Sequence, residues 1–199
     1  MSDILAIDLE TKNLSTEIGG WDKTHMFIVS TVTTWDGQIG KIYVENDIIP
    51  DLIAKAGVEI LPLRQLKFDL DDAFAKGTKL LGHNIIAFDL PVLRDSMDIY
   101  CIRKFLNNEQ YIDTSKELVK QHGERFPLQN LVDNSLGEQK SLESAMAPAL
   151  WKTGNYQEVV DYCLKDSQLV YDLYVYGIDN ELKAFSIEKE EFVELEVVW

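Results

Sequence analysis

The sequence predicts an α/β fold, a mixed β-sheet flanked by helices. Three patterns indicate it: an apolar run at the start of the chain, a β-hairpin after it, and two stretches in which a short strand leads into a helix. These patterns lie, in that order, at residues 4–7, 26–44, 79–93 and 111–121. The 199 residues are enough for one domain with a sizeable core, and no linker-like segment divides them. We therefore expect a single domain over residues 1–199.

The first strand carries two acids at its end. Residues 4–7 are apolar and run directly into Asp8, Leu9 and Glu10. Side chains alternate across a strand, so Asp8 and Glu10 share one face while Leu9 takes the other. Taken alone, such a pair most often marks a strand that leaves the core and enters a polar turn. The polar residues 11–23 that follow are predicted to be a loop at the carboxyl end of this strand, where α/β sheets commonly carry their sites.

The middle of the chain alternates strands and helices. Asp36-Gly37 is the turn of the hairpin. Asp89 stands at the start of a helix whose first turn holds a proline, so its structural role is an N-cap. Asp113 or Thr114 is the expected cap of the helix that runs to residue 121. Terminal signals and periodicity predict a strand at residues 79–82 and helices at 50–56, 65–76, 126–136 and 142–152.

Residues 155–176 form the longest helical pattern. One stripe of this helix, at spacings of three and four, consists of Val159, Tyr162, Asp166, Leu169 and Leu173. A carboxylate on an inward stripe costs several kcal/mol of desolvation unless a cation or hydrogen-bond donors compensate it, so Asp166 implies such a partner. Tyr162 by itself is typical of a core tyrosine. The tail at residues 178–199 alternates charged and apolar residues and is predicted to be an added edge strand.

Composition excludes several classes of protein. The net charge of −15 argues against a broad phosphate-neutralising surface, so any contact with nucleic acid should be short and local. Cys101 and Cys163 are too few for a disulfide framework and lack the spacing of metal ligands. The sequence has no apolar run near 18 residues and no signal-peptide pattern, which predicts a cytoplasmic protein that does not contact membranes.

Four acids fall on predicted elements that α/β topology can bring together. They are Asp8 and Glu10 at a strand end, Asp89 at a strand-to-helix junction, and Asp166 on the long helix. Hard divalent cations prefer carboxylate oxygens, and two such ions roughly 3.5–4 Å apart need about this many acids from separate elements. The constellation therefore predicts a site for two metal ions.

The motifs resemble those of a known family. In the order of the chain they are Ile7-Asp8-Leu9-Glu10-Thr11, then Asn84 with Phe88-Asp89, then Tyr162-Cys163-Leu164-Lys165-Asp166. This set resembles the DEDD superfamily of 3′→5′ exonucleases, which has a ribonuclease-H-like fold and includes polymerase proofreading domains and stand-alone predicted exonucleases. A tyrosine four residues before the last acid is similar to the tyrosine branch of that superfamily. The resemblance covers roughly residues 4–177.

The resemblance implies a fold, an activity and a site. The fold would be a ribonuclease-H-like mixed sheet of five strands flanked by helices. The activity would be metal-dependent hydrolysis of nucleic-acid phosphodiester bonds from the 3′ end, releasing nucleoside 5′-monophosphates. Asp8, Glu10, Asp89 and Asp166 would hold two Mg²⁺ or Mn²⁺ ions, and Tyr162 would orient the attacking water. Thr11 and Asn84 are the candidate contacts to the terminal nucleotide. Trp21 is a candidate to stack on a base, and its alternative role is packing within its own loop or the core.

The expected partners are single-stranded or 3′-ended nucleic acid, with DNA favoured over RNA, and a polymerase or another replication or repair protein. Two alternatives stay open from the residues. One is a catalytically silent nucleic-acid-binding or scaffold protein of the same fold. The other is a ribonuclease-H-like endonuclease, although such enzymes usually lack two acids in Asp-x-Glu on the first strand.

Overall fold

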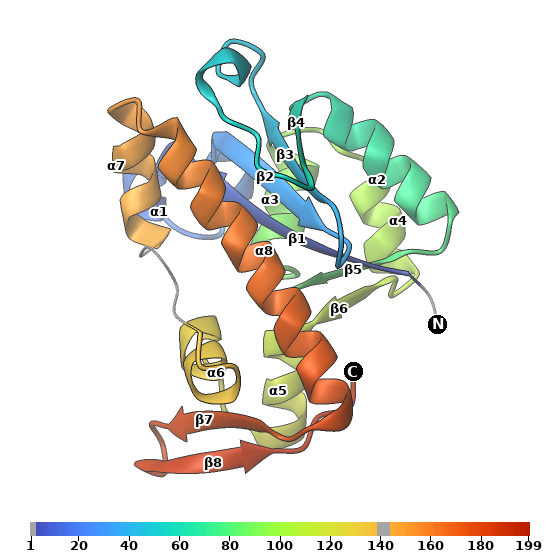
Figure 1. The fold of residues 1–199 in the computed structure, drawn as a ribbon, viewed down its shortest axis with the longest axis vertical. Helices are drawn as coiled ribbons and strands as arrows, with labels where there is room; N and C mark the ends of the chain where they lie inside the picture. The colour runs from blue at the N-terminus through green and yellow to red at the C-terminus, as the bar shows by residue number, and fades with distance from the viewer. Residues whose placement is uncertain (1–2, 139–143) are drawn as a thin grey trace.

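The structure is a computed structural model that describes residues 3–138 and 144–199. Its centre is a mixed sheet in the order β4-β3-β2-β1-β5-β6, with helices on both faces (Figure 1). The strands of this sheet are β1 (Ile4–Thr11), β2 (Val29–Trp35), β3 (Gly40–Val44), β4 (Val58–Pro62), β5 (Lys79–Gly82) and β6 (Tyr111–Asp113). The predicted α/β class is therefore confirmed.

The helices match most of the predicted ones. They are α1 (Ser15–Ile18), α2 (Gln65–Ala75), α3 (Asp89–Asp95), α4 (Cys101–Asn107), α5 (Thr114–His122), α6 (Leu128–Ser135), α7 (Ala147–Lys152) and α8 (Tyr156–Asp179). The sequence did not predict α1 and α4. Part of the helix expected at residues 142–152 lies outside the described residues, and α7 accounts for its end. Within the part of the chain that the structure describes, no helix is long and apolar enough to cross a membrane.

The sheet has six strands where five were expected. The strands β1, β2 and β3 are antiparallel neighbours, whereas β5 and β6 continue the sheet parallel to β1. The additional strand is β4, which pairs parallel to β3. The helix predicted at residues 50–56 is wrong, because only a single 3₁₀ turn forms at Ile49–Asp51. The segment is too short to sustain a helix in isolation, and pairing of the next residues with β3 determines the local structure instead.

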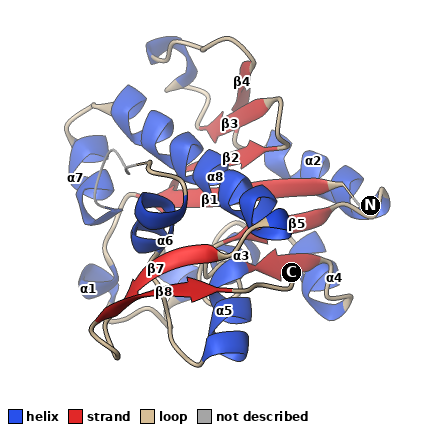
Figure 2. Ribbon diagram, turned by 60° about the horizontal axis from the view of Figure 1, so that its bottom comes forward, coloured by secondary structure: helices blue, strands red, loops and turns tan. Residues whose placement is uncertain are grey.

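The C-terminal tail does not join this sheet. Its two strands, β7 (Leu182–Ser186) and β8 (Glu191–Leu195), pair with each other as a separate antiparallel hairpin (Figure 2). The expectation of an added edge strand is therefore corrected: β8 is an edge strand, but of its own two-stranded sheet. The hairpin packs its inner face against α6 and α8 through Leu182, Ala184 and Leu195.

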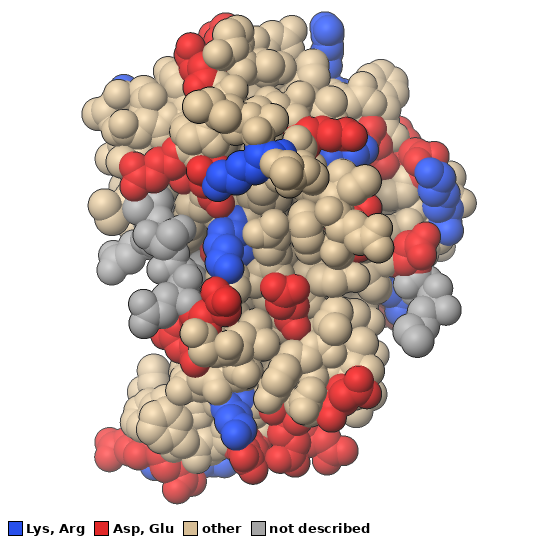
Figure 3. All heavy atoms as spheres, in the orientation of Figure 1, with Lys and Arg blue, Asp and Glu red and all other residues tan. Residues whose placement is uncertain are grey.

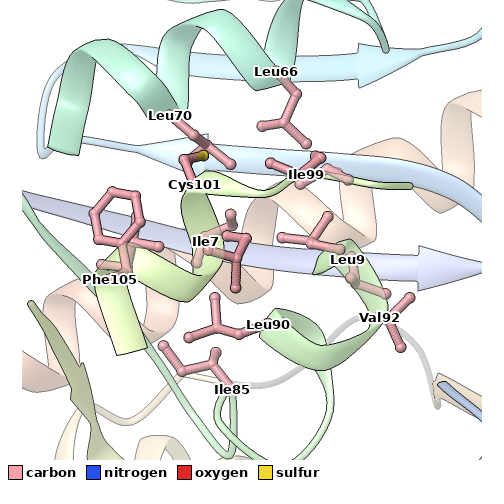
Figure 4. Close-up of a cluster of buried hydrophobic side chains, with 14 of the residues drawn as sticks. Ile7, Leu9, Leu66, Leu70, Ile85, Leu90, Val92, Ile99, Cys101 and Phe105 are labelled. Carbon is pink, nitrogen blue, oxygen red and sulfur yellow. The ribbon is translucent and has the colours of Figure 1, made fainter. Parts of the chain in front are cut away.

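The largest core lies between the sheet and α2, α3 and α4. Alternate residues of β1, Ile7 and Leu9, point into it (Figure 4). Around them pack buried side chains from the three helices and the turn after β5, including Leu66, Leu70, Ile85, Leu90, Val92 and Phe105. Burial of this many aliphatic side chains, at about 1.5–3 kcal/mol each, fixes which face of β1 is apolar. The opposite face of β1 is thereby directed towards α8, which crosses the sheet there (Figure 1).

Gly82 ends β5 at a point of very close packing. A Cβ placed on this residue would lie 2.0 Å from Cγ2 of Ile85 and 3.1 Å from the carbonyl oxygen of Ile7. Ile85 is buried and branched at Cβ, so it cannot move aside without a shift of the backbone. Only glycine allows the turn after β5 to fold back against β1.

We expect Gly82→Ala to lower the free energy of unfolding by about 1–3 kcal/mol, the usual cost of overpacking a core. Urea denaturation measures it. Gly40→Ala is the matched control, because its Cβ would meet the flexible end of Leu164 at 3.0 Å and should cost less. Equal losses in the two variants would contradict the packing argument.

Candidate active site

The carboxyl end of β1 presents Asp8 and Glu10 to α8. Asp8 is half-buried and Glu10 is buried. Cys163 of α8 lies over this pair, and its thiol donates a hydrogen bond to Oδ2 of Asp8 at 3.3 Å. Burial raises the pKa of the Cys163 thiol, and the charges of Asp8 and Glu10 raise it further. The predicted shared face of the two acids is therefore the face covered by α8.

Asp89 is joined directly to the backbone between these two acids. The amide of Leu9 donates a hydrogen bond to Oδ1 of Asp89 at 3.1 Å. β5 pairs with β1 only as far as Ala6 and Leu81, so β5 supplies no ladder partner to the Leu9 amide. The expected N-cap role of Asp89 is wrong, because α3 begins at Asp89 and its N-cap residue is Phe88. The Asp89 carboxylate instead accepts the hydrogen bond from Leu9, which is 80 positions away.

Asp89 is buried among negative charges. Burial raises the pKa of Asp89 well above its ordinary value, and the charges of Asp8 and Asp113 raise it further. The hydrogen bond from Leu9 opposes this effect without cancelling it. Such repulsion between neighbouring carboxylates is what a bound cation would relieve.

Asp113 fixes the loop that leads into α3. It is buried at the end of β6, and its carboxylate accepts hydrogen bonds from the amides of Asn84 at 2.9 Å, Ile86 at 3.0 Å and Lys116 at 3.1 Å. The last of these bonds caps α5, as predicted, but the other two were not foreseen. Asn84 has a φ of 71°, a left-handed conformation that asparagine tolerates better than most residues.

His83 ties the same loop to α5 and to the segment before α6. Its Nδ1 lies 2.9 Å from Oγ1 of Thr114, and its Nε2 lies 3.0 Å from the carbonyl oxygen of Phe126. Because a carbonyl only accepts hydrogen bonds, Nε2 carries the proton in this arrangement. The loop is thus held on both sides by partly buried polar contacts rather than by apolar packing alone.

Small polar side chains bring α8 close to the sheet. Thr33 of β2 is the cross-strand neighbour of Asp8, and its hydroxyl donates to the carbonyl of Cys163 at 3.0 Å. The hydroxyls of Thr33 and Ser167 are 2.8 Å apart. These contacts position the α8 segment that carries Tyr162 and Asp166. All five residues of the stripe predicted to face inward are buried, namely Val159, Tyr162, Asp166, Leu169 and Leu173.

The four acids are the residues that could hold a divalent cation. All their donor atoms are carboxylate oxygens, which suit Mg²⁺ and Mn²⁺, and three of the four side chains are buried: Glu10, Asp89 and Asp166. Within residues 3–138 and 144–199, however, no group of three or more Asp, Glu, His or Cys side chains stands in an arrangement that could hold a metal ion. The donor chemistry therefore fits the ion, and binding would require the carboxylates to draw together.

The three predicted substrate contacts differ in their surroundings. Thr11 is buried and its hydroxyl donates to the carbonyl of Asn13 at 2.8 Å, whereas Asn84 is half-buried in the turn before α3. Trp21 is 64% exposed, and its ring stands edge-on to that of Phe88, with centroids 5.2 Å apart. Because Phe88 directly precedes Asp89, Trp21 is an exposed aromatic ring near the start of α3.

Sequence reasoning missed the residues that hold this arrangement in place. Asp113 was interpreted as a possible cap, Cys163 was noted only for lacking the spacing of a metal ligand, and Thr33 and His83 were not singled out. The signal for Asp113 was weak but present, since it is an acid at the end of the strand next to β5.

No protein-family model matches this chain, and no curated protein matches it.

We expect the Asp89→Asn variant to be more stable than the wild type at neutral pH in the presence of chelator. The pKa of Asp89 is raised in the folded state, so the carboxyl group lowers the free energy of unfolding as pH rises through its folded-state pKa. At pH values below its pKa in the unfolded chain, Asp89 is protonated in both states and this loss of stability disappears. An asparagine keeps the acceptor for Leu9 and removes the charge. A gain of a few degrees in Tm that shrinks towards acidic pH, measured by calorimetry, is the expected outcome, at about 2–4 °C per kcal/mol for a chain of this size.

Asp113→Asn is the matched control. It also removes a buried carboxylate, but here both oxygens accept backbone amides, so one amide would face an NH₂ group and about 1–3 kcal/mol of stability would be lost. If the two variants shift Tm in the same direction, the distinction between the two carboxylates is wrong.

Proposed function

We propose that this protein is a metal-dependent 3′→5′ exonuclease that hydrolyses phosphodiester bonds of nucleic acid and releases nucleoside 5′-monophosphates. The observation that carries the proposal is the hydrogen bond from the Leu9 amide to Asp89. It fixes a third carboxylate beside the backbone between Asp8 and Glu10, while Cys163 of α8 contacts Asp8 from the helix that also carries Asp166. The order β3-β2-β1-β5-β6, with its antiparallel and parallel parts, supports the ribonuclease-H-like arrangement that the motifs resemble.

In this proposal Asp8, Glu10, Asp89 and Asp166 hold two Mg²⁺ or Mn²⁺ ions. When bound, the ions lower the pKa of a water molecule and offset charge on the scissile phosphate. Tyr162 lies one turn before Asp166 on α8 and is buried. In the proposal its hydroxyl would orient the attacking water by a hydrogen bond. A phenol with an ordinary pKa near 10 orients a water more readily than it removes its proton.

Three side chains are the proposed contacts to the substrate. Trp21 offers an exposed ring on which a terminal base can stack, a contact worth about 1–3 kcal/mol per base. Asn84, held by Asp113, offers a polar side chain, and Thr11 lies at the end of β1. We infer a 3′-ended single strand, with DNA favoured over RNA, and a replication or repair role in the cytoplasm beside a polymerase or a related protein.

A catalytically silent protein of the same fold is the second candidate. The observation that favours it is that the described side chains form no group ready to hold a metal ion. Metal binding separates the two: an ion that binds the folded protein raises Tm, whereas a silent scaffold without the site does not respond.

The test combines 5′-labelled linear and circular single strands of DNA and RNA with Mg²⁺, Mn²⁺ or chelator. We expect a metal-dependent ladder that shortens from the 3′ end, with circles intact. Asp166→Asn should reduce the rate by at least about 10²-fold, and Tyr162→Phe by less than the roughly 10²–10⁴-fold typical of lost proton transfer. Asp69→Asn is the control, because Asp69 is a half-buried carboxylate held by Lys41, Tyr43 and Gln65 on the opposite face of the sheet.

Other outcomes decide between the alternatives. Cleavage of circles would identify an endonuclease. A Tm unchanged by Mg²⁺ and Mn²⁺, together with no cleavage of any substrate, would exclude the metal-dependent mechanism and favour the silent protein.

The salt dependence of the reaction should be shallow. Three lysines are already paired with acids: Lys12 with Glu45 at 2.5 Å, Lys152 with Glu17 at 3.0 Å and Lys165 with Glu138 at 3.1 Å. These three lysines are therefore less available to neutralise phosphates, and with a net charge of −15 we expect log KM to rise with log salt at a slope of no more than about 2. Initial rates across a KCl series measure this slope, and a value near 5 would indicate a broad basic surface instead.

A further inference from the structure

The β7–β8 hairpin has two edges that differ in their hydrogen bonding. At the β7 edge, the amide of Lys183 donates to Oγ of Ser135 at 2.8 Å, and that hydroxyl donates to the carbonyl of Lys183 at 3.1 Å. In the same way, the amide of Phe185 donates to Oδ1 of Asn130 at 2.8 Å, and Nδ2 of Asn130 donates to the carbonyl of Phe185 at 2.7 Å. Side chains of α6 therefore occupy this edge as a neighbouring strand would.

The β8 edge is left open. Residues of an antiparallel pair alternate between bonding to each other and facing outward. Lys183 and Phe185 bond outward to α6, so their cross-strand partners Glu194 and Phe192 also direct their amides and carbonyls away from β7. Across the described residues, no backbone or side-chain group hydrogen-bonds to these amides and carbonyls. The edge therefore offers two donors and two acceptors to another strand.

Exposed apolar side chains adjoin this edge. Phe192 is 72% exposed, and its ring stands edge-on to that of Phe185, which is 39% exposed, with centroids 5.3 Å apart. Ile187, at the turn, is 70% exposed. Charged side chains and a lack of apolar side chains normally protect a solvent-exposed strand edge from pairing with another chain. The β8 edge has charged side chains but also exposed apolar ones.

The charge around the edge is strongly negative. Acidic side chains gather along the bottom of the molecule, over β7 and β8 (Figure 3). The segment from β7 to residue 196 contains Glu188, Glu190, Glu191, Glu194 and Glu196 but only two lysines, Lys183 and Lys189. Lys183 lies 3.7 Å from Glu194, an exposed ion pair that contributes little stability and can exchange partners.

This charge disfavours a second copy as the partner. Antiparallel pairing of two β8 edges, in any register centred from Phe192 to Glu194, places two glutamates opposite each other. Like charges directly opposite across strands are destabilising. A strand that carries lysine or arginine meets the same glutamates favourably.

We propose that the outer edge of β8 binds an extended, basic segment of another protein. The segment pairs its backbone with Phe192 and Glu194, covers the two phenylalanines with its apolar side chains, and faces the glutamates with lysine or arginine. Recognition of this kind adds a strand to an exposed edge, with affinity from main-chain hydrogen bonds and specificity from side chains. The proposal is independent of the nuclease function.

The test uses a fluorescent peptide of four Lys-Val repeats and its Glu-Val counterpart, with the full-length protein. We expect only the basic peptide to bind, with slower amide hydrogen exchange at Phe192 and Glu194. Glu194→Pro removes one outward amide, and proline is tolerated on an edge strand, so binding should weaken about fivefold or more while the fold is kept. The pair Glu191→Lys and Glu194→Lys should lose the basic peptide, whereas Glu59→Lys on β4, the exposed edge of the main sheet, should not.

Several results would overturn the proposal. These are an absence of binding, equal binding of the acidic peptide, and protection that maps away from β8. Exchange protection of Phe192 in concentrated protein without peptide would instead assign the edge to a second copy. If Glu194→Pro fails to fold, the double charge reversal and the exchange map still decide the outcome.

Discussion

The arrangement of the candidate site depends on backbone amides that the sheet leaves without a strand partner. β1 extends past the end of β5, and the amide of Leu9 at that point is taken up by Asp89. In the loop before α3, the amides of Asn84 and Ile86 donate hydrogen bonds to the carboxylate of Asp113. A buried amide without an acceptor costs free energy comparable to a lost hydrogen bond, so an acceptor oxygen is required structurally at both positions wherever the chemistry lies.

Two buried carboxylates thus have different energetic roles. Asp113 accepts hydrogen bonds from three backbone amides and stabilises the fold. Asp89 accepts one from Leu9, but the nearby charge of Asp8 makes its ionisation unfavourable to the folded state. A fold keeps such a repulsive pair at a cost in stability, and sites that bind cations or perform chemistry are the usual reason for such a pair. The approach of α8 through Thr33 and Ser167 serves the same arrangement, because short polar side chains allow the helix to lie close to the acids of β1.

The two edges of the C-terminal β7–β8 hairpin differ in how their backbone groups are hydrogen-bonded. The edge of β7 is covered by side chains of α6, while the edge of β8 is guarded only by glutamates. Part of the net charge of −15 comes from the segment that runs from β7 to residue 196, which holds five glutamates and two lysines. Charge that opposes self-association leaves the edge accessible to a basic strand.

The sequence by itself determined the elements whose periodicity is strong. The apolar start of β1, the hairpin, α2, α5, α6 and the inward stripe of α8 follow from local patterns, and the order of the motifs singled out Asp8, Glu10, Asp89 and Asp166. The sequence could not predict β4, because its pairing with β3 is non-local, and the segment before it, residues 50–56, has local signals that favour a helix. It could not predict the separate β7–β8 sheet for the same reason.

Only the tertiary structure decided which polar groups meet. The contacts of Asp89 with Leu9, of Asp113 with Asn84, and of Thr33 with Cys163 join residues 29 to 130 positions apart, and no local pattern encodes them. The sequence determined which carboxylates are present and on which faces they lie, since that follows from the periods of strands and helices. The fold decided which of them accept backbone amides and which face another charge, because these relations depend on where β5 ends and how closely α8 packs.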